Sequence, residues 1–142
     1  MRTVAVMRDE LWRFIPGFEG YYEASSLGRI RSLPRRAKRR NRVYGGHVLK
    51  LVLAGNGYHG VKLSVDNVKR THMVHELVCA AFHGAKPSPG RSCEVRHLDG
   101  DPWNNRADNL CWGTHSENEM DKLQHGTNRW QKMRAKALTE VA

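Results

Sequence analysis

The chain has 142 residues, enough for one domain or for two small interlocked modules. Its net charge of +10 points to a polyanionic partner, and its hydrophobic share of 39% predicts a modest core. The sequence has no run of about 18 apolar residues and no signal peptide within residues 1–10, so we expect neither a membrane-spanning helix nor secretion. The three cysteines lack a Cys-x-x-Cys spacing, which favours buried free thiols in a reducing compartment over a zinc site or a disulfide.

The N-terminal part of the chain has the pattern of short strands. Strands are predicted at 21–24 and 28–33, where β-forming residues are bounded by turn residues. In the second strand Ile30 alternates with Arg29 and Arg31, which gives one apolar and one basic face. We expect the basic face to contact the polyanion.

Residues 34–43 form the densest charge run of the chain. Such a run is usually a solvated loop, and we expect it to be mobile without a partner. Two interpretations stay open: a clamp on phosphates, which the total charge favours, and an idle loop. The cations of this run are Arg35, Arg36, Lys38, Arg39, Arg40 and Arg42.

The next part of the chain combines strands with one helix. Strands are predicted at 48–53 and 58–64, on either side of a Gly-Asn-Gly turn, and a third at 65–71. Apolar residues at helical spacing predict a helix over 73–82, ended by Gly84. Because so few residues cannot form two sheet layers, we expect one antiparallel sheet covered by this helix. A structural or phosphate-backbone role is favoured over metal ligation for His72 and His75.

A hairpin followed by a helix is predicted after the linker that contains two prolines. One short strand should end at His97, a loop rich in Asn and Asp follows, and a second strand is expected at 110–112. Thr114 and Glu117 have the spacing of a capping box, so a helix should begin after Thr114. Gly126 is its expected C-terminal stop.

The imidazole of His97 at the strand end then faces the carboxamide of Asn118 on the first helical turn. Such a pair can hold a general base and a hard metal ligand on either side of a phosphate. At these residues the chain resembles the HNH nuclease family, whose core is a ββα-metal hairpin and helix. The resemblance makes His97 the general base, Asn109 the residue that pins the loop, and Asn118 a ligand of a divalent metal. Further matches to the family pattern are Asn104-Asn105 and Leu110-Cys111-Trp112.

One position departs from that pattern. Arg96 stands where many members have Asp or another metal ligand, and a guanidinium cannot coordinate a cation. We expect Arg96 to hold a phosphate oxygen instead. The resemblance implies one Mg²⁺ or Mn²⁺ ion, held by Asn118, with His115 and Asp99 as further candidate ligands. A role in stabilising the turn is the favoured interpretation of Asp99.

The stretch from Trp12 to Ser32 resembles the module that often precedes HNH cores in phage and intron homing endonucleases. The resemblance implies a DNA-binding sheet, although aromatic residues such as Trp12 can simply fill a small core. We therefore divide the chain into a β-rich DNA-binding module at 8–64, an HNH core at 65–126, and a basic tail or short helix at 127–142. The tail is equally consistent with a DNA-contacting helix and with an unneeded extension.

The expected fold is α+β, a small antiparallel sheet with a covering helix followed by a ββα-metal hairpin and helix. The expected function is metal-dependent nicking or cleavage of double-stranded DNA by a monomer without an evident protein partner, with His97, Asn109, Asn118 and Arg96 as catalytic residues. It would act in the cytoplasm, that of a bacterial host if the gene is phage-borne. Two alternatives stay open: a DNA-binding protein with a degenerate nuclease site, and an RNA-binding protein, although the sequence lacks the aromatic pair of an RNA-recognition sheet.

Overall fold

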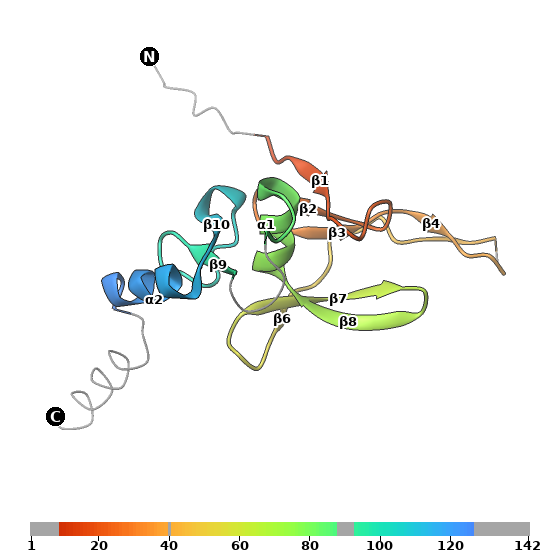
Figure 1. Cartoon of the computed structure of the whole chain (residues 1–142). Helices are drawn as coiled ribbons and strands as arrows, with labels where there is room; N and C mark the ends of the chain where they lie inside the picture. The colour runs from red at the N-terminus through yellow and green to blue at the C-terminus, as the bar shows by residue number, and fades with distance from the viewer. Residues whose placement is uncertain (1–8, 40, 88–92, 127–142) are drawn as a thin grey trace, which may run out of the picture.

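The computed structural model describes residues 9–39, 41–87 and 93–126, and Figure 1 traces their course. Arg40 and the basic tail expected at 127–142 lie outside the described residues. The described elements, in chain order, are β1 (Trp12–Phe14), β2 (Tyr22–Ser25), β3 (Ile30–Ser32), β4 (Arg35–Arg36), β5 (Val43–Tyr44), β6 (Val52–Leu53), β7 (His59–Val65), β8 (Val68–Met73), α1 (Val74–His83), β9 (Glu94–His97), the 3₁₀ turn η1 (Ala107–Asn109), β10 (Leu110–Gly113) and α2 (His115–Gln124).

Two separate three-stranded antiparallel sheets precede α1, with the strand orders β1-β2-β3 and β6-β7-β8. The α+β fold class is confirmed, but the expectation of a single sheet was wrong. The predicted strand at 48–53 is divided: Val48 forms only an isolated bridge to Arg31, and the ladder with β7 begins at Val52. Gly46, which follows β5, has a φ of +78°, a conformation that glycine adopts without strain. Its N–H donates to the Ser32 carbonyl at 3.1 Å, so the chain returns beside β3 before it enters the second sheet.

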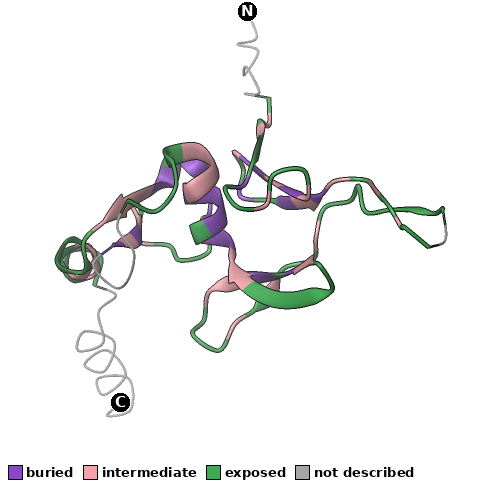
Figure 2. Cartoon of the chain, turned by 45° about the vertical axis from the view of Figure 1, so that its right-hand side comes forward, coloured by how far each residue is buried: buried purple, intermediate pink, exposed green. Residues whose placement is uncertain are grey.

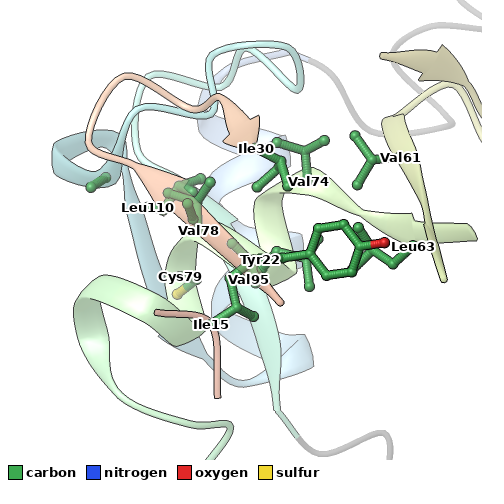
Figure 3. Close-up of a cluster of buried hydrophobic side chains, with 13 residues drawn as sticks. Ile15, Tyr22, Ile30, Val61, Leu63, Val74, Val78, Cys79, Val95 and Leu110 are labelled. Carbon is green, nitrogen blue, oxygen red and sulfur yellow. The ribbon is translucent and has the colours of Figure 1, made fainter. Parts of the chain in front are cut away.

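Helix α1 holds the two sheets and the C-terminal hairpin together. It lies centrally among them in Figure 1 and buries its apolar face against strands from each. The Tyr22 hydroxyl adds a polar link between the sheets, because it accepts a hydrogen bond from the Ser64 backbone N–H at 2.8 Å. The shared core, shown in Figure 3, includes Ile15, Tyr22, Ile30, Val61, Leu63, Val74, Val78, Cys79, Val95 and Leu110.

The hairpin of β9 and β10 has the predicted position, with His97 paired to Leu110. Helix α2 begins with the predicted capping box: the Thr114 side chain accepts from the Glu117 N–H, and the Glu117 carboxylate accepts from the Thr114 N–H. Unlike α1, α2 has no buried residue, as the absence of purple on it in Figure 2 makes plain. Polar contacts rather than a hydrophobic face must therefore fix α2 on β9.

The basic run is a two-stranded ribbon of β4 and β5, not the loop expected from its charge. The ribbon extends away from the helices in Figure 1. The turn at its base explains the strand pairing, since Gly45 adopts a φ of +87° with its backbone close to the Leu33 carbonyl. A charge run thus becomes a β-element because its neighbours dictate the pairing.

The three cysteines are free thiols, as predicted. Cys79 and Cys93 are buried as expected, but Cys111 is only partly buried. Burial raises the pKa of the Cys79 thiol to about 12, so this group stays protonated and behaves as an apolar side chain. No helix in the described part of the chain has the length and apolar character needed to cross a membrane.

Candidate active site

The imidazole of His97 lies in a pocket of aromatic and amide side chains. Its Nε2 atom lies 3.0 Å from Oδ1 of Asn105, which is itself buried. The ring stacks on Tyr58 with 6.0 Å between centroids and meets the edge of the His75 ring at 5.4 Å. These contacts restrict the orientation of the imidazole at the end of β9.

The environment keeps His97 neutral. Burial lowers the pKa of His97 below its ordinary value of 6.5, although the hydrogen bond to Asn105 and the charges of Asp99 and Asp101 act in the opposite direction. Because Asn105 accepts through Oδ1, Nε2 carries the ring hydrogen and Nδ1 keeps its lone pair. Nδ1 is therefore the atom that can take up a proton at neutral pH.

Asn109 fixes the loop between β9 and β10, as the sequence suggested. Its Oδ1 accepts from the Asp99 N–H at 3.0 Å, and its Nδ2 donates to the Asn104 carbonyl and to Asp99 Oδ1, each at 2.9 Å. Asp99 also accepts from the Asp101 N–H and from Asn104 Nδ2. With both oxygens used inside the turn, Asp99 is not brought to the helix residues that were expected to share a metal with it.

Helix α2 brings Asn118 and His115 to a residue that the sequence analysis did not single out, Glu94. Asn118 Nδ2 donates to Glu94 Oε2 at 2.6 Å, and His115 Nδ1 lies 2.9 Å from Glu94 Oε1. Burial acts to raise the pKa of Glu94, but the hydrogen bonds from Asn118 and His115 outweigh it and leave the pKa below its ordinary value. The sequence signal that could have identified Glu94 is the two-residue period of β9, which places position 94 on the same strand face as position 96.

Arg96 attaches α2 to β9. Its Nε and Nη2 donate to the two carboxylate oxygens of Asp121 at 2.6 and 3.0 Å, and its Nη1 donates to Glu117 at 3.1 Å. The side chain crosses Gly113, where a Cβ atom would collide with Cδ of Arg96. In this arrangement the guanidinium is not free to hold a phosphate oxygen, contrary to expectation.

Two open cavities meet along α2. The larger, of about 860 Å³, is lined by Glu94, His115 and His75, and the smaller, of about 100 Å³, is lined by His97. Three side chains line both cavities, namely Tyr58, Asn118 and Lys122. Asn118 thus borders the space beside the imidazole and the space beside Glu94.

Three of the arginines expected to bind phosphate are engaged within the protein. Arg29 pairs with Glu10, Arg31 pairs with Glu23 at 2.8 Å, and both guanidinium groups lie over the Trp12 ring. The Arg35 guanidinium lies over three tyrosine rings, with centroid distances of 4.8 to 5.4 Å, and donates to the Tyr22 hydroxyl. Arg35 is therefore a packing residue of the ribbon and not the exposed cation that its position in the charge run suggested.

The tip of the ribbon carries the exposed cations. Arg36 donates to the Asn41 side chain at 2.8 Å, and the side chains of Lys38, Arg39 and Arg42 are exposed. Arg36, Lys38 and Arg39 also line an open cavity of about 1150 Å³ beside β7. An exposed cationic surface of this kind suits contact with a phosphate backbone.

The family pattern implies a divalent ion at this site. No group of three or more His, Cys, Asp or Glu side chains gathers as a metal site within 9–39, 41–87 and 93–126. Glu94, His115 and Asn118 nevertheless bring one carboxylate, one imidazole and one carboxamide into direct contact. The carboxylate and the carboxamide offer oxygen donors, which suit Mg²⁺ and Mn²⁺, and the imidazole offers a nitrogen donor, so the residues present fit such an ion.

Comparison with known protein families gives matches over most of the described chain. Residues 10–64 match the NUMOD4 motif, and residues 72–120 match the HNH endonuclease family. The DNA endonuclease I-HmuI of Bacillus phage SP01 is 30% identical over 123 residues, which is 82% of this chain and 59% of that protein. An uncharacterized HNH endonuclease, L245, of Acanthamoeba polyphaga mimivirus is 30% identical over 118 residues, or 83% of this chain and 31% of the relative.

The chain therefore spans well under two thirds of the length of these relatives. Among solved structures, that of DNA binding and cleavage by the HNH homing endonuclease I-HmuI superposes with a TM-score of 0.63 at 28% identity. The superposition covers 89% of this chain and 66% of the other. With these two matches and the shared fold, the chain carries a NUMOD4 motif followed by an HNH endonuclease domain, and it is homologous to the homing endonuclease I-HmuI.

Proposed function

We propose that this chain is a divalent-metal-dependent endonuclease that hydrolyses phosphodiester bonds in double-stranded DNA. The observation that carries the proposal is the state of His97: a neutral imidazole with Nε2 held by Asn105 and Nδ1 available, beside a cavity that Asn118 also lines. The DNA binding and cleavage described for the homologue I-HmuI support the choice of substrate.

Hydrolysis of a phosphodiester requires a deprotonated water in line with the leaving 3′ oxygen. His97 Nδ1 takes the water proton, and Asn105 keeps the ring in the tautomer that allows this. Asn109 acts at a distance by fixing the loop that follows His97. When bound, a Mg²⁺ or Mn²⁺ ion near Asn118 supplies positive charge for the scissile phosphate and its leaving group.

DNA contact outside the active site falls to the N-terminal module, for which we retain the boundaries 8–64, with the nuclease core at 65–126. The exposed cations at the tip of the β4–β5 ribbon support this assignment, whereas Arg29, Arg31 and Arg35 contribute to the packing of the module. We further propose that the protein acts as a monomer in the cytoplasm of a bacterial host, by analogy with its phage relative.

One specific observation favours a second candidate function. Arg96 stands at the position before the general base, where many members of the family have a metal ligand. Its side chain forms ion pairs with Asp121 and Glu117, so this position supplies no ligand for the divalent ion. A DNA-binding protein with an inactive nuclease site would have this feature. Such a protein would bind DNA without cutting it.

Incubation with supercoiled plasmid separates the two functions. We expect nicked or linear product with Mg²⁺ or Mn²⁺ and none with a chelator. Asn118→Ala should remove the product while leaving plasmid binding intact, and Gln124→Ala, at the exposed C-terminal end of the same helix, serves as the matched amide control. Binding of plasmid by the wild-type chain without metal-dependent product would establish the second function instead.

A further inference from the structure

Within residues 9–39, 41–87 and 93–126, Glu94 is the carboxylate that touches both candidate ligands of α2. Its two oxygens are engaged separately, Oε2 by Asn118 Nδ2 at 2.6 Å and Oε1 by His115 Nδ1 at 2.9 Å. The three side chains come from two elements, β9 and the first turn of α2, so their donor atoms are fixed by the capping box and by the strand pairing. The carboxylate is one third exposed and therefore accessible from solvent.

The same three residues border the larger cavity, which is also lined by a residue with an unsatisfied hydrogen-bonding atom. His75 also lines this cavity, and its Nδ1 is buried without a hydrogen-bond partner in the part of the chain that the structure describes, with only 9% of the residue exposed. Buried polar atoms are normally satisfied, often by ordered water. A hydrated ion in the cavity brings the waters that can satisfy this nitrogen.

Arg96 cannot take the role of its family counterpart, and the strand geometry offers a substitute. Side chains two residues apart on a strand point to the same face, so Glu94 and Arg96 both face α2. Arg96 contacts the helix through Glu117 and Asp121, whereas Glu94 contacts it through His115 and Asn118. Glu94 therefore hydrogen-bonds Asn118 directly, at 2.6 Å, whereas the hydrogen bonds of the Arg96 guanidinium to α2 go to Asp121 and Glu117.

We propose that Glu94 supplies the carboxylate ligand of the divalent metal, together with Asn118 and His115, in place of the residue that precedes the general base. Rotation of the Asn118 amide by half a turn exchanges Nδ2 for Oδ1 and directs two oxygens at one cation. Binding then breaks the hydrogen bonds of Glu94 with Asn118 and His115, and His115 ligates through a deprotonated Nδ1. The inference rests on the proposed function for its choice of ion, but its test does not depend on cleavage.

Binding of Mn²⁺ to the full chain without DNA tests the ligand set, with the free ion measured by electron paramagnetic resonance. We expect one bound ion in the wild-type chain. Glu94→Gln should weaken its affinity by at least about 10-fold, since even residues outside the ligand shell change metal affinity by 10- to 100-fold. Glu76→Gln is the matched control, because Glu76 lines the same cavity. Among the residues that the structure describes, no hydrogen bond or ion pair joins Glu76 to Asn118 or His115. The affinity of this variant should stay within about twofold of the wild type.

The amide resonances of His115 and Asn118 give a second readout, since bound Mn²⁺ should broaden them in the wild type and not in Glu94→Gln. Far-ultraviolet circular dichroism of both variants establishes that they are folded. Unchanged Mn²⁺ affinity in Glu94→Gln, or no binding by the wild-type chain at millimolar Mn²⁺, overturns the inference. If the wild-type chain cuts DNA but Glu94→Gln binds Mn²⁺ as tightly as the wild type, the proposed function stands and the inference about Glu94 fails. If Mn²⁺ binding depends on Glu94 but the wild-type chain does not cut DNA, the inference stands and the proposed function fails.

Discussion

Replacement of Arg96 by methionine tests whether this residue is a structural link or a phosphate ligand. Methionine keeps an unbranched stem that can cross Gly113, and it removes every hydrogen bond from Arg96 to Asp121 and Glu117. Because α2 has no buried residue, few other contacts can compensate. We therefore expect Arg96→Met to destabilise the C-terminal helix and leave phosphate binding nearly unchanged.

The expected loss of unfolding free energy in Arg96→Met depends on how exposed Arg96 and its carboxylate partners are. The Arg96 and Asp121 side chains are 23% and 18% exposed, so their two-point contact is screened only in part. A hydrogen bond between charged groups contributes about 1.5–3 kcal/mol to stability, while the solvent-exposed ion pair with Glu117 adds little because water screens it. We expect the free energy of unfolding to fall by about 2 kcal/mol. Arg96 lowers the pKa of Asp121, so this contribution is present above the ordinary Asp value of 3.8 and is lost as pH falls through the folded-state pKa.

Urea denaturation of the wild type, Arg96→Met, Asp121→Asn and the double mutant measures the coupling between the two residues. A coupling energy above about 1 kcal/mol is expected for direct partners. Arg106→Met is the control, since Arg106 forms an exposed pair with Asp108 and should cost less than about 0.5 kcal/mol. Unchanged stability in Arg96→Met combined with a loss of DNA affinity would refute this interpretation and restore Arg96 as a phosphate ligand.

Two further predictions concern the ribbon and the buried histidine. Arg36→Gln, Lys38→Gln and Arg39→Gln together should flatten the dependence of log DNA affinity on log salt by roughly one unit per lost phosphate contact, whereas an unchanged slope would make the ribbon a solvated surface. Burial, together with the positive charge that His97 acquires at low pH, lowers the pKa of His75 from 6.5 to about 4, so the unfolded chain takes up this proton first as pH falls. Stability should be complete above pH 6.5 and decrease by about 3 kcal/mol towards pH 4 in urea denaturation, and His75→Phe should reduce that loss.

The sequence predicted the elements whose signals are local. The capping box at Thr114, the glycine at the end of α1 and the strand that ends at His97 depend on neighbouring residues, and the structure confirms each. Asn109 was also predicted to pin its loop, because the Asn- and Asp-rich turn offers partners within a few residues.

The contacts that were missed join residues distant in sequence. Arg96 meets Asp121 across 25 positions, and Glu94 meets Asn118 across 24, so no local pattern reveals either pair. The stacking of Arg35 on Tyr44 likewise depends on the pairing of β4 with β5. The charge run suggested uniform exposure, but the ribbon places one side chain over aromatic rings and directs others to solvent.

The proposed hydrolysis depends most on His97 as the general base. The decisive measurement is the single-turnover rate of plasmid cleavage by His97→Ala, together with its DNA affinity. His59→Ala is the matched control, because His59 stacks on Trp103 and does not line the cavity beside His97. We predict a loss of rate of about 10²- to 10⁴-fold for His97→Ala, with affinity within about twofold of the wild type and the control nearly unaffected. A His97→Ala variant that retains more than about a tenth of the wild-type rate would contradict the assignment of the base.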